Sequence, residues 1–147
     1  MELFDFPNKE IWEKRRCWVD DEMQCIEDGT DCSSHGAALF MDLQACYCIG
    51  AWLAVIVLSV SVIDAHLRET EALDDKMKTA KLLEEYYEGN DDINWLRKLR
   101  NQYVHLNLDN PILEVNDQFD NRTNLEADAT KAIKMVIKTL SQSISLP

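Results

Sequence analysis

Two side chains in the C-terminal half of the sequence, Arg100 and His105, have the types and the spacing needed to act on a phosphodiester. An imidazole changes its charge near neutral pH, so a histidine can take up or release a proton during a reaction. A guanidinium stays charged and can hold two phosphate oxygens at once. Cleavage of RNA without a metal needs both groups, because the 2′-hydroxyl loses a proton, the leaving 5′-oxygen gains one, and negative charge grows on the phosphate. The pair therefore indicates metal-independent cleavage of RNA.

Two neighbouring residues could support this pair. Asn101 could hydrogen-bond the phosphate or fix the tautomer of the imidazole. Tyr103 could position the same groups or stack on a base. We therefore predict Arg100 and His105 as catalytic residues, with Asn101 and Tyr103 as supporting residues.

The order of these residues resembles the motif of the HEPN (higher eukaryote and prokaryote nucleotide-binding) domains, in which an arginine and a polar residue precede a histidine by a short spacer. Here Arg100-Asn101 is followed by Tyr103-Val104-His105, which is similar to the aromatic, aliphatic and histidine ending of the family. The resemblance implies an all-α bundle that acts as an endoribonuclease with no metal or cofactor. It also implies a homodimer in which two motifs line one cleft.

The same resemblance implies a toxin of a toxin–antitoxin or other defence system, with RNA as substrate and an antitoxin or other protein as partner. A subset of HEPN toxins carries a tyrosine two residues after the histidine, where a partner nucleotidyltransferase modifies it. This sequence has Asn107 at that position. Regulation of that kind is therefore not implied.

The spacing of the pair sets a geometric condition. Positions five apart in an ideal helix lie about 140° apart around the axis, so Arg100 and His105 share a face only if the arginine reaches around or the helix ends near the histidine. We therefore expect a single chain to hold half of a site. A symmetric dimer would complete the site and would also bury apolar helix surface.

A structural interpretation of the pair stays open beside the catalytic one. Arg100 could form an ion pair with Asp64, Glu69 or another carboxylate. His105 could be a cation favoured by the negative end of a helix dipole. Most arginines and histidines on protein surfaces have such roles.

Length and charge limit the possible functions. The 147 residues fit a single domain, 1–147, and 46% hydrophobic residues suffice for a core without disulfides or metal. The formal net charge of −12 opposes unaided binding to phosphate backbones. A nucleic-acid site would therefore need a local basic cluster, and the candidates are residues 14–16 and 97–100.

The five cysteines do not suggest a disulfide framework or a zinc site. They are odd in number and irregularly spaced, and Cys46-Tyr47-Cys48 has no second pair of ligands to close a tetrahedron. No basic segment precedes an apolar stretch at Met1, so a signal peptide is not expected. We predict free thiols in a cytoplasmic protein and no bound metal.

Helical periodicity dominates the sequence, and glycine and proline are scarce. The expected architecture is all-α, a HEPN-like bundle of four or five helices around a long apolar central helix. The predicted helices cover about residues 9–26, 37–71, 73–88, 91–106 and 125–144. A turn-rich loop is predicted at 28–36 and an irregular segment at 108–123.

The uncharged run from 43 to 63 is long enough to span a bilayer, so a membrane helix must be weighed. Asp42 and Asp64 bracket the run, neither flank is rich in positive charge, and Gln44, Ser59 and Ser61 dilute it. A buried helix of a bundle or dimer is the favoured interpretation. A membrane-associated regulator stays as a minor alternative to the ribonuclease, beside a non-catalytic HEPN-like module that binds nucleotides, RNA or protein.

Overall fold

The computed structural model describes residues 3, 5–24 and 33–141, and within them it contains seven α-helices, one π-helical turn and no strand. The helices are α1 (Lys9–Met23), α2 (Ser34–Ile49), α3 (Trp52–Leu67), α4 (Thr79–Tyr86), α5 (Asp91–Val104), α6 (Asp117–Asp120) and α7 (Arg122–Ser141), and the π-helical turn η1 covers Arg68–Ala72. The predicted all-α class is confirmed.

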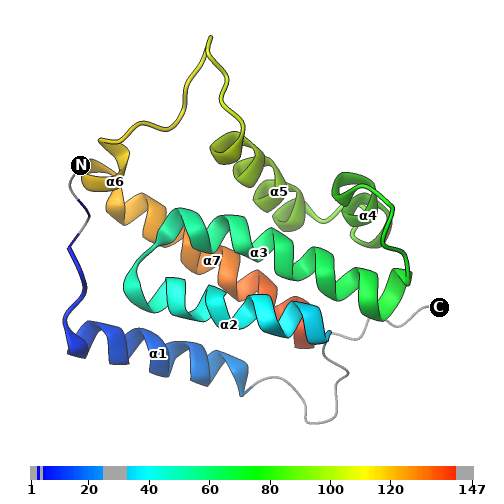
Figure 1. The fold of residues 1–147 in the computed structure, drawn as a ribbon, viewed down its shortest axis with the longest axis horizontal. Helices are drawn as coiled ribbons and strands as arrows, with labels where there is room; N and C mark the ends of the chain where they lie inside the picture. Colours follow the sequence, from blue (N-terminus) through cyan, green and yellow to red (C-terminus); the bar gives the residue numbers. More distant parts are fainter. Residues whose placement is uncertain (1–2, 4, 25–32, 142–147) are drawn as a thin grey trace.

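The single long apolar helix predicted over residues 37–71 is wrong, because the chain reverses at Gly50. This residue caps α2 with φ 80 and ψ 26, in the left-handed region that glycine enters without steric cost. The N–H of Ala51 then donates to the carbonyl of Cys46 at 2.9 Å. α2 and α3 lie side by side (Figure 1), so the apolar run buries its surface partly against itself.

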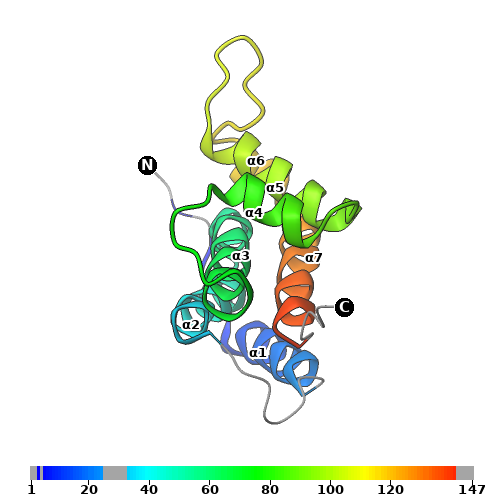
Figure 2. The same cartoon turned by 90° about the vertical axis from the view of Figure 1, so that its right-hand side faces the viewer.

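α3 lies at the centre of the bundle and contacts α2, α4, α5 and α7. Figure 2 shows α2 and α3 on one side, α7 on the other, α4 and α5 across the top and α1 along the bottom. Most of the fully buried side chains between these helices are aliphatic, among them Val55, Ile56, Ile63, Leu67, Leu96, Ile133 and Val136, and Trp52 is a buried aromatic ring. The hydrophobic effect thus makes α3 the element on which the other helices pack.

A capping interaction joins the start of α2 to η1. The buried Ser33 hydroxyl accepts the N–H of Gly36 at 2.8 Å and donates to Glu69 at 2.6 Å. Glu69 also accepts the N–H groups of Ser34 and His35. The hydroxyl and then these amides lower the pKa of the Glu69 carboxyl, which complements the positive end of α2.

The helix predicted over residues 73–88 is shorter than expected. Leu73 has φ 50, which a leucine rarely adopts, and it ends the helical path after η1. The Asp74 carboxylate then accepts the N–H groups of Lys76 and Met77, at 2.7 and 3.3 Å. This side-chain turn competes with the helix, so α4 begins only at Thr79.

The remaining helix ends differ by a few residues from those predicted. α1 stops at Met23, and α2 begins inside the predicted loop. α5 is capped by Asn90 and stops at Val104. The short helix α6 and the start of α7 occupy part of the segment predicted as irregular. Residues 25–32 and 142–147, with Cys25, Cys32 and most of the predicted 28–36 loop, lie outside the described residues. In the part of the chain that is described, no helix has both the length and the apolar character to cross a membrane.

The turn at Gly50 predicts that alanine substitutions at Gly50 and at Gly89 lower the stability by different amounts. A Cβ at Gly50 would lie 3.0 Å from Nη2 of Arg122 and 3.2 Å from Nη1 of Arg15, whereas a Cβ at Gly89, with φ 72, would meet nothing within 4 Å. Gly89→Ala should cost about 1–2 kcal/mol for the left-handed backbone. Gly50→Ala should cost at least about 1 kcal/mol more, because the displaced guanidiniums lose hydrogen bonds. Urea denaturation of both variants checks this, and equal losses would contradict it.

Buried His66 predicts a pH-dependent stability. The side chain is 4% exposed and its Nδ1 has no hydrogen-bond partner among the described residues. Burial lowers its pKa from 6.5, against the weaker opposing effects of Glu71 and Glu69. The unfolded chain therefore binds a proton more readily, and the free energy of unfolding should fall as the pH drops below 6.5.

Thermal and urea denaturation between neutral and mildly acidic pH measure this effect. His66→Gln should lose stability at neutral pH but show a flatter pH profile than the wild type. His35→Gln, at an exposed position, serves as the control and should keep the wild-type profile. Parallel profiles for His66→Gln and wild type would show that another group is responsible.

Candidate functional site

The predicted catalytic residues lie at the C-terminal end of α5. The helix stops at Val104, and His105 leaves it with φ −112 and ψ 111, an extended conformation. The backbone N–H of His105 still donates to the carbonyl of Asn101 at 3.0 Å. The helix therefore ends at the histidine, but this bond keeps the His105 nitrogen on the helical path, and only the chain that follows leaves the helix axis.

Arg100 is half-buried and is held by a neutral group. Its Nη1 donates to Oδ1 of Asn101 at 2.9 Å, and its buried Nε has no acceptor among the described residues. Asp64 pairs instead with Arg68 at 2.7 Å, and Glu69 caps α2. The alternative of an ion pair between Arg100 and Asp64 or Glu69 is therefore wrong.

The two supporting residues differ in their contacts. Asn101 holds the arginine through its side chain and the histidine through its carbonyl. Tyr103 is half-buried against the core, and burial, with smaller effects of Asp128 and Asp117, raises the pKa of its hydroxyl. The bond to His105 is the ordinary backbone bond of a helix, so the side chain of Asn101 positions only Arg100.

A cavity of about 270 Å³ opens beside the histidine. Tyr103 and the exposed His105 line it, together with residues of the loop that follows α5, and Arg100 is not among the lining residues. One chain thus brings Arg100 to Asn101 and His105 to Tyr103, without placing all four around one cavity.

Exposed apolar side chains surround this end of α5. The loop between α5 and α6 projects from the body of the bundle in both views (Figures 1 and 2). Val104 at the end of α5 is 43% exposed, and four apolar residues of the loop are exposed as well: Leu106 74%, Leu108 84%, Ile112 42% and Val115 61%. Such a concentration of exposed apolar groups is typical of a contact surface.

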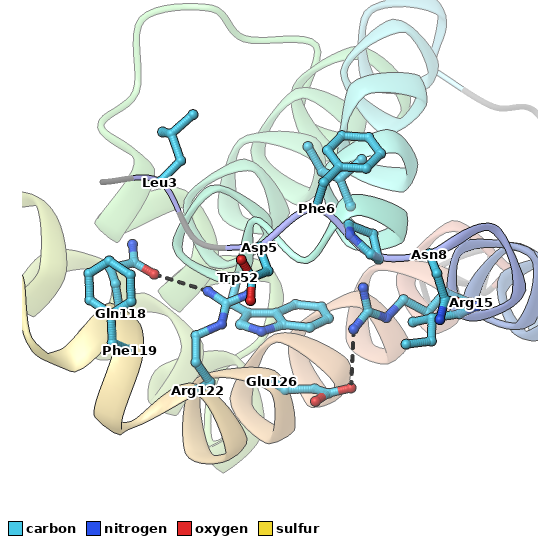
Figure 3. A pocket seen from close by; sticks show the side chains of 13 residues that line it. Leu3, Asp5, Phe6, Asn8, Arg15, Trp52, Gln118, Phe119, Arg122 and Glu126 are labelled. Atoms are coloured by element: carbon cyan, nitrogen blue, oxygen red, sulfur yellow. Dashed lines mark hydrogen bonds and ion pairs between the residues drawn. The ribbon is translucent and has the colours of Figure 1, made fainter. Parts of the chain in front are cut away.

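A second site, which sequence reasoning missed, lies where the N-terminal segment crosses the α2–α3 turn (Figure 3). Guanidiniums from α1 and α7 stack on the ring of Trp52, with Arg15 Cζ at 4.7 Å and Arg122 Cζ at 5.5 Å from its centroid. Nη1 of Arg15 donates to the carbonyl of Cys48 at 3.1 Å, and Nη2 of Arg122 donates to that of Gly50 at 2.6 Å. The two arginines hold the C-terminal end of α2.

These arginines line one wall of a cavity of about 890 Å³. Burial lowers the pKa of the Arg122 guanidinium, and the neighbouring charge of Arg15 lowers it further. Nη2 of Arg15 is 4.0 Å from the half-exposed Glu126 carboxylate, and Asp5 also lines the cavity. Two like charges thus converge beside an open space.

No local signal in the sequence identifies this site. Arg15 belongs to a short basic cluster on a helix face, Trp52 to the apolar run, and Arg122 to a segment predicted as irregular. They meet only because α1 and α7 both pack on the α2–α3 pair. Among the described residues, no group of acidic, histidine and cysteine side chains could hold a metal ion.

Comparisons of the chain with known protein families, with curated proteins and with solved structures find no match.

Proposed function

We propose that the chain is a metal-independent endoribonuclease of HEPN type that acts as a homodimer, as a toxin or defence protein would. The observation that carries the proposal is the end of α5, where Arg100-Asn101 is followed by a helix stop that frees and exposes His105. The motif residues and the helical layout are its support.

The hydrogen-bond partners of Arg100 support a role in binding phosphate. Among the described residues its charge is met by the amide of Asn101 and by no carboxylate. An amide partner leaves the net charge of a guanidinium in place, whereas a carboxylate partner would neutralise it and compete with a phosphate group for the same donors.

The chemistry assigned to the pair is transesterification. His105 removes the proton of the 2′-hydroxyl, whose oxygen attacks phosphorus and displaces the 5′-oxygen. A second imidazole or a water donates the proton that the leaving oxygen needs, and Arg100 stabilises the charge on the phosphate. The products are a 2′,3′-cyclic phosphate and a 5′-hydroxyl.

A second copy of the chain completes the site in this proposal. Arg100 is not among the lining residues of the cavity beside His105, and exposed apolar residues surround that cavity. Contact between two copies through these residues would bring each arginine towards the other copy's histidine and remove apolar surface from water. It would also concentrate positive charge in a chain whose net charge is −12.

The first test is RNA cleavage in the presence of EDTA. Arg100→Ala and His105→Ala should each lower the rate by at least about 10²-fold, because each removes a group that acts in the transition state. Lys138→Ala removes an exposed cation of α7 that belongs to neither basic cluster, so it is the control and should stay within a few-fold of wild type. Circular dichroism should show the same helix content in all variants. Undiminished cleavage by His105→Ala would refute the proposal.

The second test concerns the dimer. Leu106→Asp combined with Leu108→Asp places charges on the exposed apolar surface and should convert the dimer to a monomer without RNA cleavage. Met41→Asp, at a position of α2 that is 71% exposed, introduces the same charge elsewhere and should leave the dimer and its activity intact. Light scattering and the cleavage assay measure both outcomes, and a fully active monomer would contradict the shared site.

A non-catalytic HEPN-like module that binds RNA, nucleotides or protein is the second candidate. The acidic net charge of −12 and the separation of Arg100 from the cavity of His105 favour it. It predicts stable self-association through the loop after α5 with no RNA turnover. The cleavage assay separates the two candidates.

A further inference from the structure

The cavity beside His105 is bounded by a turn with its own hydrogen bonds. Oδ1 of Asn107 accepts the N–H of Asp109 at 3.0 Å, and the carbonyl of Asn107 accepts the N–H of Asn110 at 3.2 Å. Pro111 then fixes the backbone at the next position. The turn therefore gives a defined shape to the part of the loop that lines the cavity together with the end of α5.

The size and the walls of this cavity suit one nucleobase. Its volume is about 270 Å³, whereas cavities for drug-sized ligands measure about 300–1,000 Å³, and a single base is smaller than such ligands. The half-buried Tyr103 and Leu113 and the exposed Ile112 form the apolar part of the lining. Proteins that take a base out of its stack hold it between aromatic and apolar side chains.

Most of the polar groups that line the cavity are amides. Among the lining residues there is no lysine, arginine, aspartate or glutamate, although 29% of the residues of the chain are charged. The neutral lining is therefore a property of this cavity and not of the surface in general. Within the described part of the chain, no hydrogen bond engages the side-chain amides of Gln102 and Asn110, which line the cavity beside His105.

These amides match adenine better than the other bases. An amide of asparagine or glutamine can accept from N6 of adenine and donate to N7. Arginine and lysine are the usual partners of guanine, and aspartate and glutamate accept from N4 of cytosine. The cavity lacks these charged partners, and uracil, with a single ring, would fill less of it. The lining thus favours adenine.

We propose that this cavity binds the base of the nucleotide whose 2′-hydroxyl reacts, and that Gln102 and Asn110 select adenine there. The inference rests on the proposed function, in which His105 removes the proton of that 2′-hydroxyl, and on the position of the cavity beside the histidine. It adds a substrate class to that function, single-stranded RNA that is cut on the 3′ side of adenosine.

Fluorescence polarisation measures the selection of the base separately from cleavage. The probes are short strands of 2′-deoxyuridine with a 3′ fluorophore, which have no 2′-hydroxyl to react, and their central base is adenine, guanine, cytosine or uracil. The adenine strand should bind at least about 10-fold more tightly than the other three, because one good bidentate pair discriminates between bases by roughly 5- to 150-fold.

Replacing each amide by a carboxylate should change the preferred base. Asn110→Asp and Gln102→Glu leave only acceptors, so each should lower the preference for adenine by about 10-fold and favour the cytosine strand, whose N4 donates. Asn94→Asp makes the same change near the other end of α5 and should keep the wild-type preference. Ratios between strands are compared within each variant, so a general loss of affinity from the added negative charge cancels.

Equal binding of the four strands would overturn the inference, as would a wild-type preference for adenine in both Asn110→Asp and Gln102→Glu. Gln102 lies on α5 outside the turn, so its variant keeps the test valid if Asn110→Asp unfolds the loop. Sequencing of RNA cut by the wild type should place the cuts after adenosine. Cleavage after all four bases with equal binding would refute this inference and leave the ribonuclease proposal intact. Adenine-selective binding without cleavage would refute the ribonuclease proposal and retain the base site.

Discussion

The reversal of the chain at Gly50 is the constraint on which the rest of the structure depends. The sequence from 37 to 67 has helical propensity throughout, and a continuous helix would leave its apolar surface to be covered by other elements. The left-handed backbone at Gly50 folds this run into α2 and α3. α3 then becomes the buried axis against which α5 and α7 pack.

The same turn determines where the arginines of two distant helices meet. The carbonyls of Cys48 and Gly50 face outward at the end of α2 and need donors, which Arg15 and Arg122 supply from α1 and α7. These contacts connect the first and last described helices to the centre of the bundle. They also place two cations at one cavity.

Positive charge is scarce in this acidic protein, and the arginines discussed above have partners of three kinds. Arg68 pairs with a carboxylate, Arg15 and Arg122 bind carbonyls above an indole ring, and Arg100 is bound by a neighbouring amide. The pairing with Asp64 neutralises Arg68, whereas among the described residues the side chain that bonds Arg100 is a neutral amide.

The sequence by itself determined the all-α class and the approximate positions of most helices, and it predicted the Arg100 to His105 segment as a candidate site. These properties depend on residues near one another in the chain, such as the periodic apolar positions and the polar residues that cap α1 and α5. Only the tertiary structure decided the reversal at Gly50, because propensity alone does not compare one long helix with two that bury each other. It also decided that Arg15, Trp52 and Arg122 meet, because such contacts join segments far apart in the chain. The path of the loop after α5 decided that Arg100 lies outside the cavity of His105.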